Sequence, residues 1–281
     1  MQNLNNYIQE KLNKINSNNA YHYKYVPKTK EELKYILKER LKKDKNADLN
    51  DIDVSNITDM NNLFCKLDPH NIDISEWDVS NVENMKGIFY ECKNFNSDLN
   101  KWDVHNVKYM GIAFYNCIKF NSDLSRWDVS NVINFSGMFF YCKSFNSDLS
   151  NWDVSNAKDM SFMFNECKDF NSDLGKWNVS KVTDMNYMFA HCTKFNLDLS
   201  KWDVSNAEDM SYMFYNCTKF NSNLSNWDVS NVKYMSNLFT GCIMFNSDLN
   251  KWNVSNVEDM RYMFNNSPLE KNPPKWYKIN N

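Results

Sequence analysis

The chain has 281 residues, a mass of 33.4 kDa and a formal charge of −3, so its length allows one large domain or two of ordinary size. No apolar run is long enough for a membrane-spanning helix, and the mean hydropathy is −0.67. The aromatic content of 15% excludes a disordered chain, and only five glycines exclude collagen and glycine-rich phosphate loops. Residues 1–30 contain no apolar segment of the kind that forms a conventional secretory signal, so we expect none.

The charge is uneven along the chain. Residues 1–50 hold eleven Lys and Arg against six Asp and Glu, a net of +5, and residues 51–281 hold 21 against 29, a net of −8. A basic head on an acidic body is compatible with contact to nucleic acid or an anionic surface. A solvated, lysine-rich helix is the explanation that we favour, and we predict no nucleic-acid partner.

The first expected elements are two helices. A weak amphipathic pattern opens the chain, formed by Leu4, Tyr7, Ile8, Leu12 and Ile15. Thr29 and Glu32 then form a capping box after Pro27, which predicts a helix over residues 30–43. Its apolar face is formed by Leu33, Ile36, Leu37 and Leu41. Residues 1–47 are therefore predicted to be an N-terminal helical cap.

The next feature is a repeat with a period of 25 residues. The period is marked by Trp77, Trp102, Trp127, Trp152, Trp177, Trp202, Trp227 and Trp252. Ile52 takes the equivalent place in a degenerate first unit, so nine units run from residue 48 to residue 266. Self-similarity of this kind is typical of proteins in which repeats stack and bury a shared core. We predict that the tryptophans form a buried structural column.

Each unit has nine recurring apolar positions. In one unit they are Phe145, Leu149, Trp152, Val154, Ala157, Met160, Met163, Phe164 and Cys167. Trp152 and Val154 are two residues apart, as in a short strand. Residues 157–164 follow a spacing of three or four, as in a short helix, with Asn156 and Asp159 as its cap. The fold class predicted is an α/β repeat solenoid with leucine-rich-repeat-like coils, each a short strand plus a short helix.

The last segment breaks the repeat. Ser267 replaces the expected cysteine, and Pro268, Pro273 and Pro274 prevent another coil. We predict a C-terminal cap over residues 267–281, in which Trp276 or Tyr277 covers the last core layer.

The repeat resembles that of the BspA-like leucine-rich-repeat surface proteins, in the group with 25-residue repeats found in bacterial surface lipoproteins. The matching motif, F-N-x-D-L-S-x-W-D-V-S-N-V-x-x-M-x-x-M-F-x-x-C, is present at Phe195 to Cys217, with Leu197 at the first variable place and Ala207 for the second valine. The resemblance covers about 220 residues and implies a solenoid, display at the cell surface, and binding of host or neighbouring-cell proteins, with cytoplasmic location as the alternative. The motif marks core positions, so no catalytic residues carry over.

Two kinds of column could carry chemistry. One is the row of cysteines at Cys92, Cys117, Cys142, Cys167, Cys192, Cys217 and Cys242. We expect reduced core thiols there, with disulfides and a metal site as alternatives. The other kind is two aspartate rows, at Asp98, Asp123, Asp148, Asp173, Asp198 and Asp248, and at Asp78, Asp103, Asp128, Asp153, Asp203 and Asp228. Stacked carboxylates could bind Ca²⁺, but Asn178, Asn223 and Asn253 interrupt them, which favours Asx turns.

The function we expect is binding of another protein by a non-catalytic repeat protein. The candidate contact residues precede each tryptophan: Lys101, Arg126, Asn151, Lys176, Lys201, Asn226 and Lys251, with Glu76 at the start. A second candidate is an aromatic row containing Phe162, Tyr187, Tyr212 and Tyr262, with Tyr90, Tyr115, Phe140 and Tyr215 nearby. Solubilising surface and core-edge packing are the alternatives for the two rows. We expect no enzyme activity, cofactor or metal, and a monomer, with end-to-end self-association as the alternative.

Overall fold

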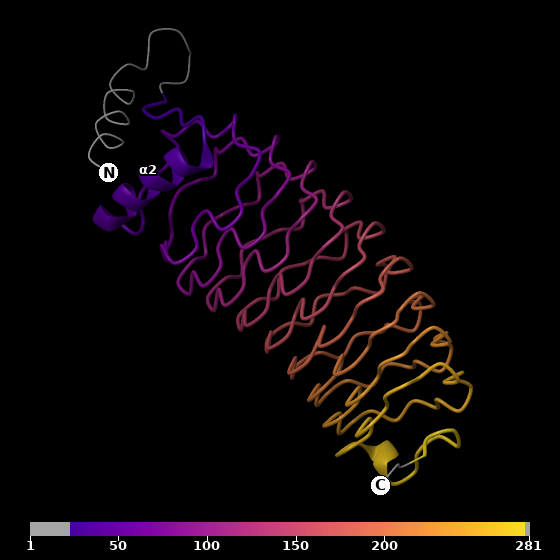
Figure 1. Cartoon of the computed structure of the whole chain (residues 1–281). Helices are drawn as coiled ribbons and strands as arrows, with labels where there is room; N and C mark the ends of the chain where they lie inside the picture. The colour runs from indigo at the N-terminus through magenta and orange to yellow at the C-terminus, as the bar shows by residue number, and fades with distance from the viewer. Residues whose placement is uncertain (1–22, 279–281) are drawn as a thin grey trace.

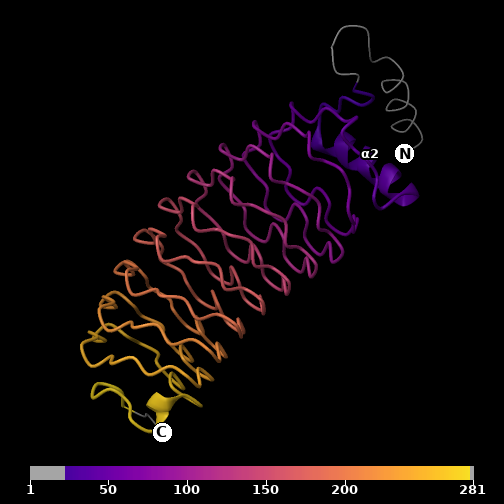
Figure 2. The ribbon, with the colours of Figure 1, turned by 180° about the vertical axis from the view of Figure 1, so that it is seen from behind.

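Residues 25 apart in the sequence lie side by side. In the computed structural model, which describes residues 23–278, a chain of parallel bridges joins one column from Asp59 through Asn84, Tyr109 and so on to Asp259, always in steps of 25. The coils therefore stack in register along one axis, and the described part of the chain runs from one end of an elongated body to the other (Figure 1). The view from behind shows the same stack from its other side (Figure 2).

Each coil is a series of tight turns. In one unit, backbone N–H groups donate to the carbonyl three residues back at Trp152, Ala157, Met163, Asn165, Cys167 and Phe170. Between these, the N–H groups of Met160, Phe162, Phe164 and Glu166 donate to the next coil, at the carbonyls of Asp184, Asn186, Met188 and Ala190. Alternate N–H groups thus serve their own coil and the next one, at distances of 2.8–3.2 Å.

The predicted fold class of strand-plus-helix units is wrong. Within residues 23–278 the helices are α2, Lys30–Lys43, and the 3₁₀ helix η1, Pro268–Glu270, and the bridges are isolated rather than extended strands. The segment 157–164 is a run of turns, and Asn156 caps no helix: its side-chain amide donates to the carbonyl of Ser130 in the preceding coil. The Met and Phe spacing that predicted a helix is produced here by consecutive three-residue turns.

Left-handed backbone at two places per coil prevents the helix. Phe162 has φ 57° and Glu166 has φ 63°, and the same two columns are left-handed in the other coils. A helix needs right-handed residues throughout, and a left-handed aromatic residue is an uncommon, costly conformation. Gly87 and Gly137 occupy the first column in two coils, where this backbone carries no penalty.

The tryptophans are buried and joined from coil to coil. The indoles of the repeats are 3–4% exposed, and neighbours such as Trp152 and Trp177 lie parallel with ring centroids 6.4 Å apart. The Trp152 Nε1–H donates to the carbonyl of Leu124 in the preceding coil at 2.9 Å, and every repeat tryptophan makes the equivalent bond. The tryptophan column is therefore held together both by apolar packing of the rings and by hydrogen bonds from one coil to the preceding one.

The cysteine row follows the same plan. The seven repeat cysteines are free thiols, and each Sγ–H donates to a phenylalanine carbonyl of the preceding coil, as Cys167 does to Phe139 at 2.9 Å. Burial raises the pKa of the Cys167 thiol well above its ordinary value, so the proton that donates is retained.

Helix α2 covers the first coil. It begins after Thr29, whose side chain accepts from the Glu32 N–H, and it coincides with the helix expected from the sequence. Its apolar face is buried through Leu33, Ile36, Leu37 and Leu41. The weaker amphipathic segment predicted over residues 4–15 lies outside the described residues.

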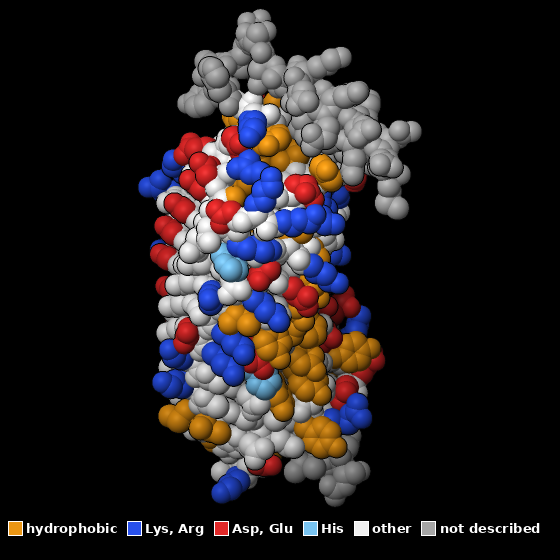
Figure 3. Space-filling model, turned by 90° about the vertical axis from the view of Figure 1, so that its left-hand side faces the viewer, with side chains coloured by type: hydrophobic (Ala, Val, Ile, Leu, Met, Phe, Trp, Pro, Cys, Tyr) orange, Lys and Arg blue, Asp and Glu red, His pale blue; other side chains and the backbone are white. Residues whose placement is uncertain are grey.

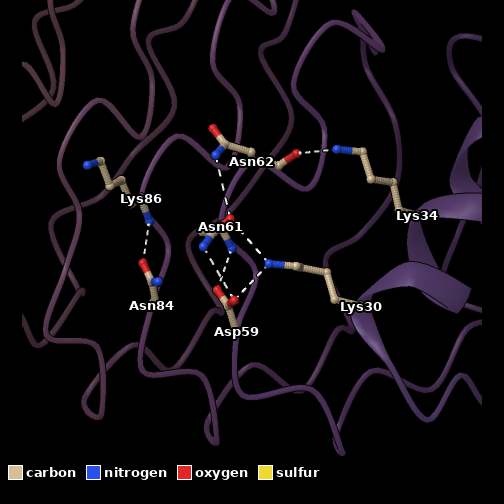
Figure 4. Close-up of polar contacts among 7 residues, drawn as sticks. All are labelled: Lys30, Lys34, Asp59, Asn61, Asn62, Asn84 and Lys86. Carbon is tan, nitrogen blue, oxygen red and sulfur yellow. Dashed lines mark hydrogen bonds and ion pairs between the residues drawn. The ribbon is translucent and has the colours of Figure 1, made fainter.

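Cations of α2 bind polar groups at the end of the stack. The Lys30 Nζ lies 2.7 Å from Asp59 Oδ2 and 3.2 Å from Asn61 Oδ1, and the Lys34 Nζ donates to the Asn62 carbonyl at 3.0 Å (Figure 4). Part of the basic charge near the N-terminus therefore serves to hold the cap in place.

The other end is partly covered by η1 and two aromatic rings. Trp276 stacks on Trp252 with centroids 6.2 Å apart, and its Nε1–H donates to the Leu249 carbonyl. The Tyr277 ring meets Phe264 edge-on at 4.9 Å. The prediction that one of these rings covers the last core layer is confirmed. Within residues 23–278 no helix has the length and apolar character needed to span a membrane.

Replacement of Trp152 tests the indole column. Trp152→Ala removes a buried ring, and we expect it to lower the free energy of unfolding by about 3–5 kcal/mol in a urea titration. Trp152→Phe keeps a ring but removes the indole donor from the Leu124 carbonyl, which still accepts from the Trp127 N–H, so we expect a smaller loss of about 0.5–1.5 kcal/mol. A loss below about 1 kcal/mol for the alanine variant would show that the ring is not in the core.

Thiol titration tests the cysteine row. In native protein, Ellman's reagent should react rapidly with Cys65 alone, because Cys65 is partly exposed and the seven others are buried. In denaturant without reductant all eight thiols should react. The variant Cys65→Ser should show no rapid reaction. A second rapid thiol would contradict the packing, and fewer than eight in denaturant would mean that disulfides form.

Candidate functional site

The pre-tryptophan column consists of the residues that precede each repeat tryptophan. Each lies in the tight turn that the tryptophan N–H closes, as Asn151 lies between Leu149 and Trp152. Its members are exposed, namely Glu76, Lys101, Arg126, Asn151, Lys176, Lys201, Asn226 and Lys251. They occupy a turn rather than the strand expected for them. Lys101 pairs with Glu76 one coil earlier, which raises the pKa of the lysine through a hydrogen bond.

The two aspartate rows form Asx turns, as predicted. Asp148 Oδ1 accepts from the Ser150 N–H at 2.9 Å, and Asp153 Oδ1 accepts from the Ser155 N–H at 2.9 Å. The asparagines that interrupt the rows do the same, as Asn223 does for Ser225 at 3.1 Å. A neutral oxygen is sufficient there, and no group of three or more metal-ligating side chains is present among residues 23–278.

A third acidic row was not recognised from the sequence as a row of Asx turns. It includes Asp159, Asp184 and Asp209, which are bridged residues of consecutive coils and each accept from the N–H two residues on. Burial, with the charges of its two neighbours, raises the pKa of Asp184 to about 6, although its hydrogen bonds with Asn186 act in the opposite direction. The regular recurrence of Asp or Asn before Met is the available signal, but its spacing from Asn156 also fits a helix cap, which is the structure that the sequence predicts.

The aromatic stripe is a chain of ring contacts over several coils. Its members are Tyr90, Tyr115, Phe140, Tyr141, Phe162, Tyr187, Tyr212 and Tyr215. The rings are half-buried, and the tightest pair, Tyr187 and Tyr212, has centroids 4.4 Å apart with an interplanar angle of 5°. Figure 3 shows hydrophobic side chains gathered on one face of the stack, bordered by charged ones.

Stacking explains how aromatic residues tolerate left-handed backbone in this stripe. Phe162, Tyr187 and Tyr212 all have positive φ, which places their rings one above another on the surface. Contacts between aromatic rings contribute about 0.5–1.5 kcal/mol per pair, which offsets part of the backbone cost. Where neighbouring rings are parallel, as in Phe162, Tyr187 and Tyr212, their faces cover each other, and that part of the stripe presents ring edges and phenol hydroxyls to solvent. Phe140 instead meets Phe162 edge-on, at 72°.

Charged groups lie beside the stripe. Lys143 lies 5.8 Å from the centre of the Tyr141 ring. The Glu166 carboxylate lies 3.7 Å from Lys168 Nζ and 4.0 Å from His191 Nδ1. The His191 ring meets the Tyr215 ring edge-on. The stripe therefore has an apolar centre with charges of both signs at its edge, as protein-binding surfaces commonly do.

The structure joins most of the aromatic residues named from the sequence. Tyr262 is the exception, because it is 60% exposed and Asn237 separates it from Tyr212 in the column. Tyr141 and His191 were missed. They belong to the second left-handed column, whose members are of several different residue types, so spacing alone gives no signal for them.

The raised pKa of Asp184 predicts a pH dependence. The folded state holds this proton more tightly than the unfolded state, so stability should fall as pH rises from the ordinary carboxyl pKa to about 6. Asp184→Asn should then raise the unfolding midpoint at about pH 8 and leave it nearly unchanged at about pH 4. The pKa of Asp128 is lowered by its bonds to Ser130, so Asp128→Asn should not stabilise at about pH 8. Equal effects of Asp184→Asn at both pH values would contradict the assignment.

The chain is similar to a known protein family along its repeat region. A family model described as "Mycoplasma protein of unknown function, DUF285" matches residues 31–139, 113–218 and 196–280. No curated protein and no solved structure matches the chain. The family matches overlap and together span the whole repeat region, so the chain belongs to the DUF285 family of repeat proteins.

Proposed function

We propose that this protein is a non-catalytic binding protein whose coil stack presents the aromatic stripe to another protein. The observation that carries the proposal is the continuity of the stripe from Tyr90 to Tyr215, with rings that are half-buried and held in line by their own stacking. Tyrosine contributes strongly to protein interfaces because it brings a large contact area with few rotatable bonds.

The ring geometry favours protein over other ligands. Nucleobases bind aromatic side chains by stacking on an open ring face. In the parallel part of the stripe those faces are taken by neighbouring rings, as at Phe162 and Tyr187, whose planes differ by 7°. Ring edges and hydroxyls remain, and these suit the mixed apolar and polar surface of a folded protein.

The pre-tryptophan column has a secondary part in this proposal. Its lysines are exposed on long side chains, and Lys101 already has an acidic neighbour, so each contributes little to affinity. Exposed charges at the edge of an interface mainly raise the rate of association with an oppositely charged partner.

The resemblance to BspA-like surface proteins supports a finer proposal. By that resemblance the partner is a host or neighbouring-cell protein, the activity is adhesion, and the site of action is the cell surface. Action in the cytoplasm is the alternative location. Self-association end to end is less favoured, because α2 covers one end of the stack.

Affinity capture with matched variants tests the proposal. The double variant Tyr187→Asn with Tyr212→Asn suits the backbone, because Asn237 occupies the same column with φ 55°. Proteins captured from extracts of the source and host cells by the wild type should be reduced about tenfold or more with this variant. Reversal of Lys101, Arg126, Lys176 and Lys201 to Glu should slow association and have a smaller effect on dissociation.

The control is Tyr234→Asn, which removes an exposed aromatic residue outside the stripe. It should capture the same proteins as the wild type. Capture that persists unchanged in the double variant would rule out the stripe, and loss only on charge reversal would move the site to the pre-tryptophan column.

A further inference from the structure

The last coil has backbone donors without described acceptors. In every earlier coil the N–H groups at this place bind the next coil, as Met235, Asn237 and Phe239 bind the carbonyls of Asp259, Arg261 and Met263. One coil later, the N–H groups of Met260, Tyr262 and Phe264 bind no described residue. The fourth donor, Asn266, is covered by the Glu270 carboxylate at 3.1 Å.

The apolar columns are also uncovered at this end. Val229, Val232 and Met235 are at most 1% exposed, whereas the next members of the same columns, Val254, Val257 and Met260, are only partly buried. The C-terminal rings cover a different part of the layer, around Trp252 and Phe264. At the opposite end the equivalent positions, Val54, Ile57 and Met60, are at most 3% exposed under α2.

A hollow of about 780 Å³ lies over this uncovered half of the coil. Its floor includes Val254, Val257 and Met260, and Trp276 and Tyr277 form one side. Glu258, Asp259 and Arg261 stand at its rim, and the two last are paired with each other. It therefore combines an apolar floor with a row of aligned N–H donors, which is the chemistry of an edge that accepts another strand.

We propose that this end of the stack binds a peptide segment of another protein that resembles the repeat itself. The hollow continues the coil-to-coil interface, so the fitting occupant offers carbonyls at alternate residues and apolar side chains at the spacing of the Ala207, Met210 and Met213 segment. That segment already covers the same columns of an earlier coil, where the carbonyls of Asp209, Ser211 and Met213 accept from the N–H groups of Met185, Tyr187 and Phe189.

A second copy of this chain fits less well. The end that would meet the donors carries α2, whose Lys30 and Lys34 bind Asp59, Asn61 and the Asn62 carbonyl, and whose leucines are buried on the first coil. Stacking of two chains would require this helix to leave. A peptide segment from another protein needs no such displacement.

A peptide-binding experiment tests this inference. The probe is a fluorescein-labelled peptide with the sequence of residues 206–216, and the comparison is a peptide of the same composition in scrambled order. We expect saturable binding to the full chain by fluorescence polarisation, at concentrations below about 1 mM, and none for the scrambled peptide. No binding, or equal binding of both peptides, would overturn the proposal.

Variants locate the binding site. Val257→Lys and, separately, Val254→Lys place a charge in the hollow and should weaken peptide binding about tenfold or more. Ser255→Lys adds the same charge on an exposed neighbour outside the hollow and should bind as the wild type does. Unfolding midpoints show which variants remain folded, and peptide binding unaffected by either folded valine variant would contradict the assignment.

Two further measurements separate the alternatives. Light scattering without peptide should give a constant monomer mass, and concentration-dependent growth that Val257→Lys abolishes would make a second copy the occupant and overturn the proposal. The Tyr187→Asn with Tyr212→Asn variant should bind the peptide normally, so the end site and the aromatic stripe can fail independently.

Discussion

The division of backbone N–H groups between two tasks is the constraint on which this structure depends. In each coil, one set closes tight turns, as the Met163 N–H does, and the alternate set donates along the axis to the next coil, as the Phe164 N–H does. A coil alone would leave the second set without acceptors, and buried donors without partners cost about 1–3 kcal/mol each. The coils are therefore stable only in a stack, and every stack has a donor end and an acceptor end.

Side chains reinforce the same axial bonding. The Trp152 indole, the Cys167 thiol and the Asn156 amide each donate to a carbonyl of the preceding coil. Asx turns complete the bonding within each coil, because the side chains of Asp148 and Asp153 accept from the backbone N–H groups of Ser150 and Ser155. Residues that recur every 25 positions are thus selected for what they bond to above and below, which explains why polar and apolar columns are equally regular.

The register and the buried columns could be predicted from the sequence, because the unbroken period of the tryptophans leaves one way to align the coils. Helix α2 could be predicted too, since Thr29 and Glu32 carry a local capping signal. The internal structure of the coil could not. The spacing from Ala157 to Phe164 fits a helix and a run of turns equally, and the deciding left-handed residues are mostly not glycine.

The same reasoning explains which parts of the surface were foreseeable. Interchange of Asp and Asn within a column indicates that the side-chain oxygen acts as a hydrogen-bond acceptor and needs no charge. An Asx turn uses the oxygen in this way, so these turns could be predicted. The aromatic residues were visible as a row, but the way in which Phe162 and Tyr187 cover each other's faces depends on the left-handed backbone. The uncovered half of the last coil depends on where Trp276 and Tyr277 settle, which no repeat pattern specifies.

The most direct measurement of this account is the detection of hydrogen-bond scalar couplings by nuclear magnetic resonance on deuterated protein. The amide nitrogens of Met160, Phe162 and Phe164 should couple to the carbonyl carbons of Asp184, Asn186 and Met188 in the next coil. Couplings from these nitrogens to carbonyls four residues earlier in their own coil would indicate a helix instead, and would contradict the account.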